Sequence, residues 1–533
     1  MAETENRGIR IVRRVFPLHR KQNTTVTKLS IVDASVGRFS ACGAIWFFNG
    51  TPRLSAHDPT VFERLESALI QTLDDYRHFA GQLRWATKEQ VKADDNPRYV
   101  GRPIVTYGTA SDPGVELVIS DDRRELKDLV PSLAERSSSL RVWNASGLSQ
   151  GDFLPPTKLA FSSLGEFEGL PGVAVQLTTF KCGGFAVSMK LTHCLSDAIC
   201  LVHFIHSWAS HSQKLFDSEQ AIAEVATPIF DPRRLDSYAN LEPKASNPDP
   251  ERIQKARSLP MHRYDWWATD APGYPAWATS GSNATKPPPD ELSQTDLSPS
   301  EYPPWPTWDL SKACEHMQIR FSSAEISGMK AVAVKTLPSD LADQRVSRQD
   351  SILAHLWILI NRARQLERSD DTIYMDMSLG MRSRLDPPLP DSFIGSPIFL
   401  GHVISSGAKA TAETSMGVVA GSIRKMMARF TPTAVSDYLY DAAHEVSPQR
   451  LWQAFLGSRH VLVTSWARSR AYEVDFFGTG TLPRYVQSQM PLMDGLLQLI
   501  DVGETGDFDI SLALEKGVMD RLLSDPLLRA YDS

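Results

Sequence analysis

Two apolar, β-rich segments followed at once by an amphipathic helical pattern constrain the fold of this chain more than any other feature. The segments span residues 173–180 and 185–191, and Cys182-Gly183-Gly184 separates them. From 199 to 208 the apolar residues recur near a 3.6-residue period, which is typical of a helix with one buried face. The order strand, turn, strand, helix predicts an α/β protein in which His193 lies where a strand ends and a helix begins.

His193 and Asp197 form the one His-x-x-x-Asp tetrad of the chain. A histidine between a strand and a helix can project into a cleft while both elements hold its backbone, and such a position suits a general base. With 13 histidines, roughly one such tetrad is expected by chance. In the alternative interpretation, His193 is an ordinary hydrogen-bonded histidine and Asp197 only caps the helix. The tetrad alone does not decide between the two.

Composition limits the kinds of protein this can be. A chain of 533 residues is too long for one ordinary core, and two domains are expected. A net charge of −7 without a basic run argues against nucleic acid or an anionic membrane as partner. The five cysteines are odd in number and form no Cys-x-x-Cys, which suits a reducing compartment. With no secretory pattern at the start and no apolar run of membrane length, the sequence predicts a cytoplasmic protein.

A segment rich in proline and tryptophan connects two halves of the chain that have a similar alternation of strand and helix patterns. Residues 231–310 hold fourteen of the 35 prolines and five of the twelve tryptophans, and no periodic segment is evident there. Proline density predicts a long crossover linker, and its aromatic content predicts that the linker packs on the domains. We therefore expect an N-terminal domain at 1–230, the linker at 231–310 and a C-terminal domain at 311–533.

Local patterns predict further elements in both halves. Apolar spacing predicts helices at 62–83 and 348–366, and Ser322 with Glu325 has the form of a helix-capping box. β-rich runs predict strands at 41–48, 104–108, 115–119 and 316–321.

Several blocks together resemble the BAHD acyltransferases, and within them the fungal branch that includes trichothecene 3-O-acetyltransferase. His193 and Asp197 match the family's His-x-x-x-Asp-Gly motif, with Ala198 where glycine is usual. Segments similar to other family blocks lie at 73–83, 176–184 and 378–395, and in the last of these Ser396 follows in place of the usual asparagine. The resemblance covers nearly the whole chain apart from the linker. It implies two chloramphenicol-acetyltransferase-like α/β domains, each a mixed β-sheet with flanking helices, joined by the long crossover.

The family's second signature, Asp-Phe-Gly-Trp-Gly, has a variant here. Asp475, Gly478 and Gly480 match its aspartate and glycines, but one residue is inserted and the tryptophan is missing. In the family this loop is structural and its aspartate pairs with an arginine. The resemblance implies that Arg382 is the partner of Asp475.

The resemblance implies an O-acyltransferase that moves an acyl group, with acetyl the expected one, from acyl-CoA to a hydroxyl of a secondary metabolite. His193 is the expected general base for direct attack in a ternary complex, and Asp197 is expected to be structural, orienting the motif loop through an ion pair. Ser465 and Trp466 are candidates for the oxyanion site or the active-site wall. The acceptor is expected to be a terpenoid, polyketide or alkaloid alcohol. No metal is implied, and a monomer is expected.

Rival interpretations are weaker but informative. The stretch 147–151 has the Gly-x-Ser-x-Gly form of the nucleophile elbow of an α/β-hydrolase. The prolines after it disfavour the helix that such an elbow requires. Peptide-synthetase condensation domains have a second histidine where this chain has Thr192. Because the 475–480 loop is altered, another function stays open, in which the same fold does not use CoA and serves as a small-molecule binding protein or cyclase. Cys194 is a poor nucleophile candidate, because a Cys–His pair requires convergence in space rather than adjacency in sequence.

Two further side chains have simple structural interpretations. Trp357 on an apolar helix face is expected in the core. Arg384, with Arg382, forms either a solvated pair or a structural salt bridge.

Overall fold

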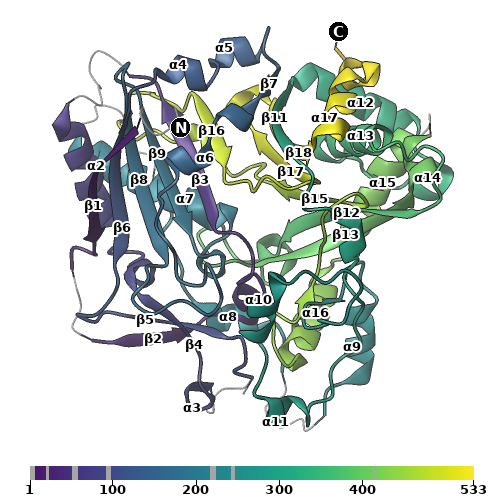
Figure 1. The fold of residues 1–533 in the computed structure, drawn as a ribbon, viewed down its shortest axis with the longest axis horizontal. Coiled ribbons are helices and arrows are strands. Elements are labelled where there is room, and N and C mark those ends of the chain that lie inside the picture. Colours follow the sequence, from purple (N-terminus) through teal and green to yellow (C-terminus); the bar gives the residue numbers. More distant parts are fainter. Residues whose placement is uncertain are drawn as a thin grey trace.

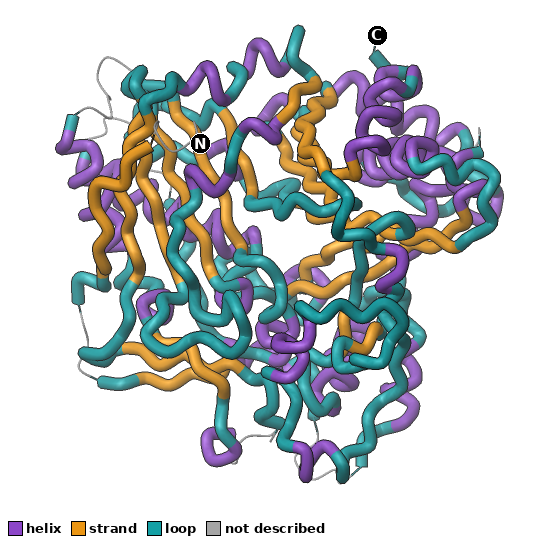
Figure 2. The backbone as a smooth tube through the Cα atoms, in the orientation of Figure 1, coloured by secondary structure: helices purple, strands orange, loops and turns teal. Residues whose placement is uncertain are grey.

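Two large mixed β-sheets with flanking helices organise the chain, as the computed structural model shows (Figure 1). The structure describes residues 7–19, 23–50, 58–91, 98–216, 224–241, 247–412 and 415–532. The mixed α/β class predicted from the sequence is confirmed, and the two sheets form separate groups of strands in Figure 2.

The first sheet has six strands, and parallel pairing occurs only between its second and third members. In spatial order the strands are β1 (Arg7–Val15), β6 (Val115–Asp122), β8 (Val173–Phe180), β9 (Phe185–Leu191), β3 (Cys42–Phe48) and β16 (Tyr485–Ser488). Every residue of β3 and β8 is buried, so both faces of the sheet centre are covered.

The second sheet has seven strands, with parallel pairs at its middle. In spatial order these are β13 (Ile398–Ser406), β12 (Thr372–Gly380), β15 (His460–Ser465), β17 (Leu496–Asp501), β18 (Phe508–Glu515), β11 (Cys314–Phe321) and β7 (Val142–Asn144). Two smaller sheets comprise β2 (Thr25–Lys28), β5 (Pro103–Tyr107) and β4 (Gln82–Trp85), and β10 (Tyr264–Asp265) with β14 (Leu451–Trp452).

Seventeen α-helices are found in the described ranges. Those before the linker are α1 (Ile31–Ser35), α2 (Pro59–Thr72), α3 (Lys88–Val91), α4 (Leu126–Leu129), α5 (Leu133–Arg136), α6 (Gln150–Phe153) and α7 (Ala198–Leu215). The linker holds α8 (Pro232–Ser237), α9 (Pro250–Arg257), α10 (Ala278–Asn283) and α11 (Pro289–Leu292). The rest are α12 (Ser323–Lys335), α13 (Arg348–Ala363), α14 (Gly407–Thr411), α15 (Ser415–Ala428), α16 (Pro432–His444) and α17 (Lys516–Ser524).

Several expected elements are present with altered limits. The helix expected at 62–83 ends at Thr72, and a 3-10 turn and strand β4 occupy the remainder. The helix expected at 348–366 is α13, on which Trp357 is buried in the core as expected. Ser322 and Glu325 form the predicted capping box of α12. One short helix, α6, begins within the Gly-x-Ser-x-Gly stretch, at Gln150, although the prolines that follow disfavour a helix there.

The two halves of the chain exchange strands. β7, from the N-terminal half, closes one edge of the second sheet, and β16, from the C-terminal half, closes one edge of the first. The hydrophobic cores are interleaved in the same way: Ile31 and Val32 belong to the second core, whereas Trp466 and Phe476 belong to the first. The boundaries proposed near 230 and 310 stay a prediction, but a contiguous cut at either place would divide these shared sheets.

The linker contains four short helices in addition to loops, although no periodic segment is evident in its sequence. In Figure 2 loop backbone still dominates the region around α9, α10 and α11. Its aromatic residues form a separate core with two residues of the C-terminal half, Val446 and Phe455; the linker members are Tyr264, Trp266, Trp267, Ala271, Ala278 and Trp305. The linker is therefore an ordered layer on the C-terminal half rather than a free tether.

No helix within the described residues is long and apolar enough to cross a membrane.

The aromatic cluster of the linker generates a stability prediction. Trp305 is 4% exposed and its ring contacts those of Trp266 and Phe455, whereas Trp277 in the same segment is 55% exposed. We expect Trp305→Ala to lower the free energy of unfolding by about 3–5 kcal/mol. Trp277→Ala, the matched control, should cost far less. Urea unfolding followed by circular dichroism measures both, and equal costs for the two variants would contradict an ordered linker core.

Candidate active site

His193 occupies the junction between the central hairpin of the first sheet and α7. Strand β9 ends at Leu191, and a 3-10 turn, His193–Leu195, leads to Asp197, the N-cap of α7. The Asp197 carboxylate accepts a hydrogen bond from Cys200 N at 2.9 Å, so the helix start is satisfied locally. His193 thus lies at the strand end that the sequence predicts, partly buried.

One serine of the C-terminal half fixes the imidazole. Nδ1 of His193 lies 3.3 Å from Ser396 Oγ, and the Ser396 hydroxyl donates to the backbone carbonyl of His193. A serine hydroxyl carries a single proton, so toward Nδ1 it offers only a lone pair. The bond therefore requires the tautomer that carries its proton on Nδ1, and Nε2 is left with a free lone pair.

The environment keeps this imidazole neutral. Burial lowers the pKa of His193 from its ordinary value of 6.5, while its own carbonyl and Asp197 oppose that shift. The ring of Phe39 packs edge-on against it, with centroids 5.4 Å apart. A neutral imidazole with a fixed tautomer can accept a proton at pH 7 without first losing one.

A buried carboxylate holds Ser396 in turn. Asp33 Oδ1 accepts from Ser396 N at 2.6 Å, and Oδ2 accepts from Ser30 N and Ser30 Oγ at 3.0 and 2.6 Å. Burial raises the pKa of Asp33 to about 6, although its hydrogen bonds with Ser30 and Ser396 oppose the shift. Gly395 has a φ of +142°, and a Cβ there would lie 2.9 Å from Asp33 Oδ1. Glycine is therefore needed for the close approach of these segments.

Asp33, Ser396 and Phe39 were not among the predicted site residues. Asp33 lies in a Ser-x-x-Asp pattern, which indicates a helix cap, and the structure does show a capping box at α1. Ser396 was visible only as a departure from an asparagine. Ser396 lies 203 positions from His193 in the sequence, and no local pattern can predict a contact between residues so far apart.

Asp197 forms a buried ion pair with Arg382. Arg382 Nη1 lies 2.5 Å from Asp197 Oδ2 and Nη2 lies 3.1 Å from Oδ1, a two-pronged arrangement. Arg382 also donates to Phe393 O at 2.8 Å, and Asp197 N donates to Gly395 O at 3.0 Å. Four hydrogen bonds thus tie the start of α7 to the segment that carries Ser396.

The expected pairing of Arg382 with Asp475 was wrong, because each group has a different partner. Asp475 accepts from three backbone amides of its own turn, Phe477, Gly478 and Gly480, at 2.9, 3.0 and 2.7 Å. The two glycines have positive φ values of 68° and 75°, which lets the turn close around the carboxylate. Phe476 and Phe477 then insert into the first core, where their rings contact Trp208 and Phe185 respectively.

Ser465 and Trp466 lie at the end of β15. Ser465 Oγ accepts from Ala467 N at 3.3 Å, and Trp466 is buried in the first core. Among the residues that the structure describes, neither side chain is hydrogen-bonded to His193. Their assignment to an oxyanion site stays a prediction.

The remaining candidates have structural surroundings. Arg384 donates to Gly380 O at 2.8 Å rather than to a carboxylate. Burial raises the pKa of Cys194, which disfavours the thiolate that a nucleophile needs.

The fold is thus a two-part α/β arrangement in which a histidine at a strand end of the first sheet contacts a serine of the opposite half. The Transferase family model matches residues 157–263 and 274–527, more than half of the chain, and the protein belongs to this family, the BAHD acyltransferases. It is accordingly an acyltransferase of a family that uses acyl-CoA.

Curated relatives agree with this assignment, and a solved structure shares the fold. The chain is 26% identical to Acyltransferase AFT15-1 of Alternaria alternata over 92% of its own length and 90% of that protein. It is 25% identical to Acyltransferase abl6 of Leptosphaeria maculans over 83% and 80%. The crystal structure of F. graminearum TRI101 complexed with coenzyme A and deoxynivalenol shares the fold, with a TM-score of 0.64, 16% identity and coverage of 95% and 99%.

The buried ion pair generates a second prediction. Asp197→Asn keeps a helix-capping oxygen but leaves Arg382 buried and without its counter-charge, so we expect the free energy of unfolding to fall by about 3–5 kcal/mol. Asp249, the N-cap of α9, accepts amide hydrogen bonds and is exposed, so Asp249→Asn is a matched control with no expected change. Thermal and urea unfolding measure both. Wild-type stability of Asp197→Asn would show that the pair does not stabilise the fold.

Proposed function

We propose that this protein is an O-acyltransferase that moves an acyl group, with acetyl the first choice, from acyl-CoA to a hydroxyl of a secondary metabolite, with His193 as general base. The observation that carries the proposal is the hydrogen bond from His193 Nδ1 to Ser396, which leaves Nε2 free to accept a proton. The fungal relatives support an acyl transfer of this kind.

The chemistry of the acceptor explains why a base is needed. An aliphatic hydroxyl is essentially neutral at pH 7, so its proton must leave as the oxygen attacks the thioester carbonyl. His193 Nε2 accepts that proton, and the resulting imidazolium returns it to the departing CoA sulfur. The thioester is already activated, so a covalent acyl-enzyme is unnecessary and direct attack in a ternary complex suffices.

Charged and polar neighbours would assist each stage. Asp33, which is largely ionised above its pKa of about 6, would stabilise the imidazolium through Ser396. Asp197, held by Arg382, would orient the loop rather than accept a proton. The oxyanion of the tetrahedral intermediate needs a donor, for which we propose Ser465 or Trp466.

We propose that the acceptor is a terpenoid, polyketide or alkaloid alcohol. We also propose a cytoplasmic monomer; all five cysteines are unpaired, which supports a reducing compartment. The competing function is a BAHD-type fold that binds or cyclises a small molecule without CoA. The altered 475–480 loop favours it, although the carboxylate of Asp475 is fully bonded within its turn.

Removal of the proposed base should abolish turnover. We expect His193→Ala to lower acceptor-dependent thiol release from acetyl-CoA by about 10²–10⁴-fold, the usual contribution of a general base. His211→Gln, which changes a partly exposed histidine of α7, is the control and should retain wild-type rates. The assay uses a panel of hydroxylated fungal metabolites. Thiol release that is equal in His193→Ala and wild type would contradict the proposal, and no CoA binding at all would favour the competing function.

The pH profile tests the role of Ser396 as a positioning residue. Only neutral His193 can act as base, so kcat/KM should be constant above its pKa and fall tenfold per pH unit below it, with a midpoint under 6.5. Ser396→Ala removes the acceptor of the Nδ1 proton, so kcat should fall by about 10-fold, or about 1.4 kcal/mol, and the midpoint should move lower. Ser396→Thr keeps the hydroxyl and should restore both. An unchanged profile in Ser396→Ala would contradict this role.

A further inference from the structure

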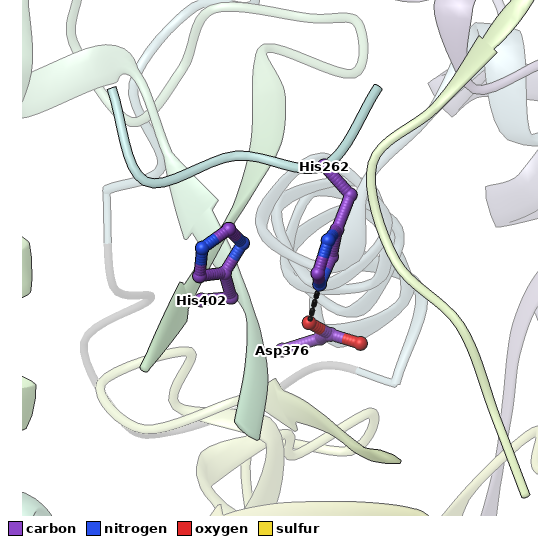
Figure 3. Close-up of side chains that lie close together, drawn as sticks. All are labelled: His262, Asp376 and His402. Atoms are coloured by element: carbon purple, nitrogen blue, oxygen red, sulfur yellow. Dashed lines mark hydrogen bonds and ion pairs between the residues drawn. The ribbon is translucent and has the colours of Figure 1, made fainter. Parts of the chain in front are cut away.

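A carboxylate and three histidines converge in the second sheet, away from His193. Asp376 on β12 and His402 on β13 are cross-strand partners, and His460 begins the neighbouring strand β15. His262 comes from the linker, just before β10, and crosses over these strands (Figure 3). Four segments that are distant in sequence therefore meet at one place.

The carboxylate is held from two sides. Nε2 of His262 lies 3.0 Å from Asp376 Oδ1, and Nδ1 of His460 lies 2.9 Å from Oδ2. Phe455 N also donates to Oδ2 at 3.0 Å. One potential ligand atom from each of His262, Asp376 and His402 lies within 4.8 Å of the other two.

Among the described residues, no lysine or arginine forms an ion pair with the carboxylate of this cluster. Asp376 is fully buried, and in the described part of the chain its ion-pair partners are only His262 and His460. A buried carboxylate that has no lysine or arginine partner is costly.

His402 adds a second, independent observation. Its Nδ1 atom is buried and has no hydrogen-bond partner among the described residues. In Figure 3 the ring of His402 lies beside that of His262, with one nitrogen turned toward it, and the two centroids are 4.2 Å apart. Two imidazoles and one carboxylate, with one ring nitrogen still unpartnered among the described residues, form a donor set that suits a metal ion.

We propose that His262, Asp376 and His402 bind a zinc ion, with His460 and the Phe455 amide orienting the second oxygen of Asp376. Imidazole and carboxylate are ligands that suit Zn²⁺, at about 2.0–2.2 Å, so adjacent ligand atoms of a tetrahedral site lie about 3.4 Å apart. The His262–Asp376 pair already has that spacing within a few tenths of an ångström. The ligand atom of His402 lies within 4.8 Å of the other two, so a shift of its side chain by about 1.4 Å or less brings it to that spacing. The BAHD resemblance implies no metal, so this site rests on the residues alone.

The ion would stabilise the attachment of the linker to the second sheet. His402 N donates to Pro260 O at 2.8 Å, and Tyr264 begins the short pairing of β10 with β14. A ligand from residue 262 would lock the linker to the second sheet between these two contacts. A cavity of about 50 Å³ borders His262 and has room for a water molecule.

Metal analysis tests the proposal with the full-length, tag-free protein. After dialysis against excess zinc and removal of free ion, wild type should retain about one zinc per chain. Cobalt in place of zinc should give the visible absorption of a tetrahedral site. His402→Gln removes a ligand but no hydrogen bond to Asp376, so it should lose the zinc and weaken binding at least 10-fold. His211→Gln, outside the cluster, should bind as wild type does.

Two outcomes would overturn the site. Wild type that retains less than about 0.1 zinc per chain shows that the cluster is only hydrogen-bonded, and this holds whether or not the variants fold. Equal zinc content in wild type and His402→Gln places the ion elsewhere. Both results are independent of acyl transfer, so the proposed function stands or falls separately.

Discussion

The buried ion pair between Asp197 and Arg382 is the contact on which the geometry of the site depends. Both side chains are almost fully buried, so neither charge can be solvated instead. Such pairs contribute little net stability, because desolvation offsets much of the attraction, but the loss of one partner is costly. Its main effect is positional. The same two residues bond to Phe393 O and Gly395 O, which fixes the next residue, Ser396, beside His193.

The arrangement of the proposed catalytic residues follows from this fixed position of Ser396 beside His193. Asp33 holds Ser396, and Ser396 selects the tautomer of His193, so three segments from both halves of the chain determine one free lone pair. The order is carboxylate, hydroxyl, imidazole, and each bond limits the orientation of the next group. Ser396 has two functions, since its hydroxyl donates to the His193 carbonyl and its oxygen faces Nδ1. A residue that only filled space could not impose a tautomer.

Sequence patterns predicted what depends on neighbours in the chain. Periodicity located β8, β9 and the start of α7, and therefore His193. The partner of Arg382 was wrong because spacing cannot show which of two carboxylates is satisfied locally, and the Asp475 turn supplies its own three amide donors. The exchanged strands were missed because β7 and β16 have only three and four residues, too few for a periodic signal. The linker helices were missed because they are only four to eight residues long and lie in a proline-rich segment.

Strand exchange also limits how substrates can reach the site. Arg136, in the N-terminal half, is buried against Asp509 on β18 at 2.5 Å, and Tyr472 donates to the same carboxylate oxygen at 2.6 Å. Hinge opening between the halves would break this pair and detach β7 and β16 from their sheets. Relative motion of domains is the usual expectation unless their interface is large and hydrophobic, and here the two halves share strands and hydrophobic cores. On the proposed function, substrates would therefore approach His193 without separation of the two halves.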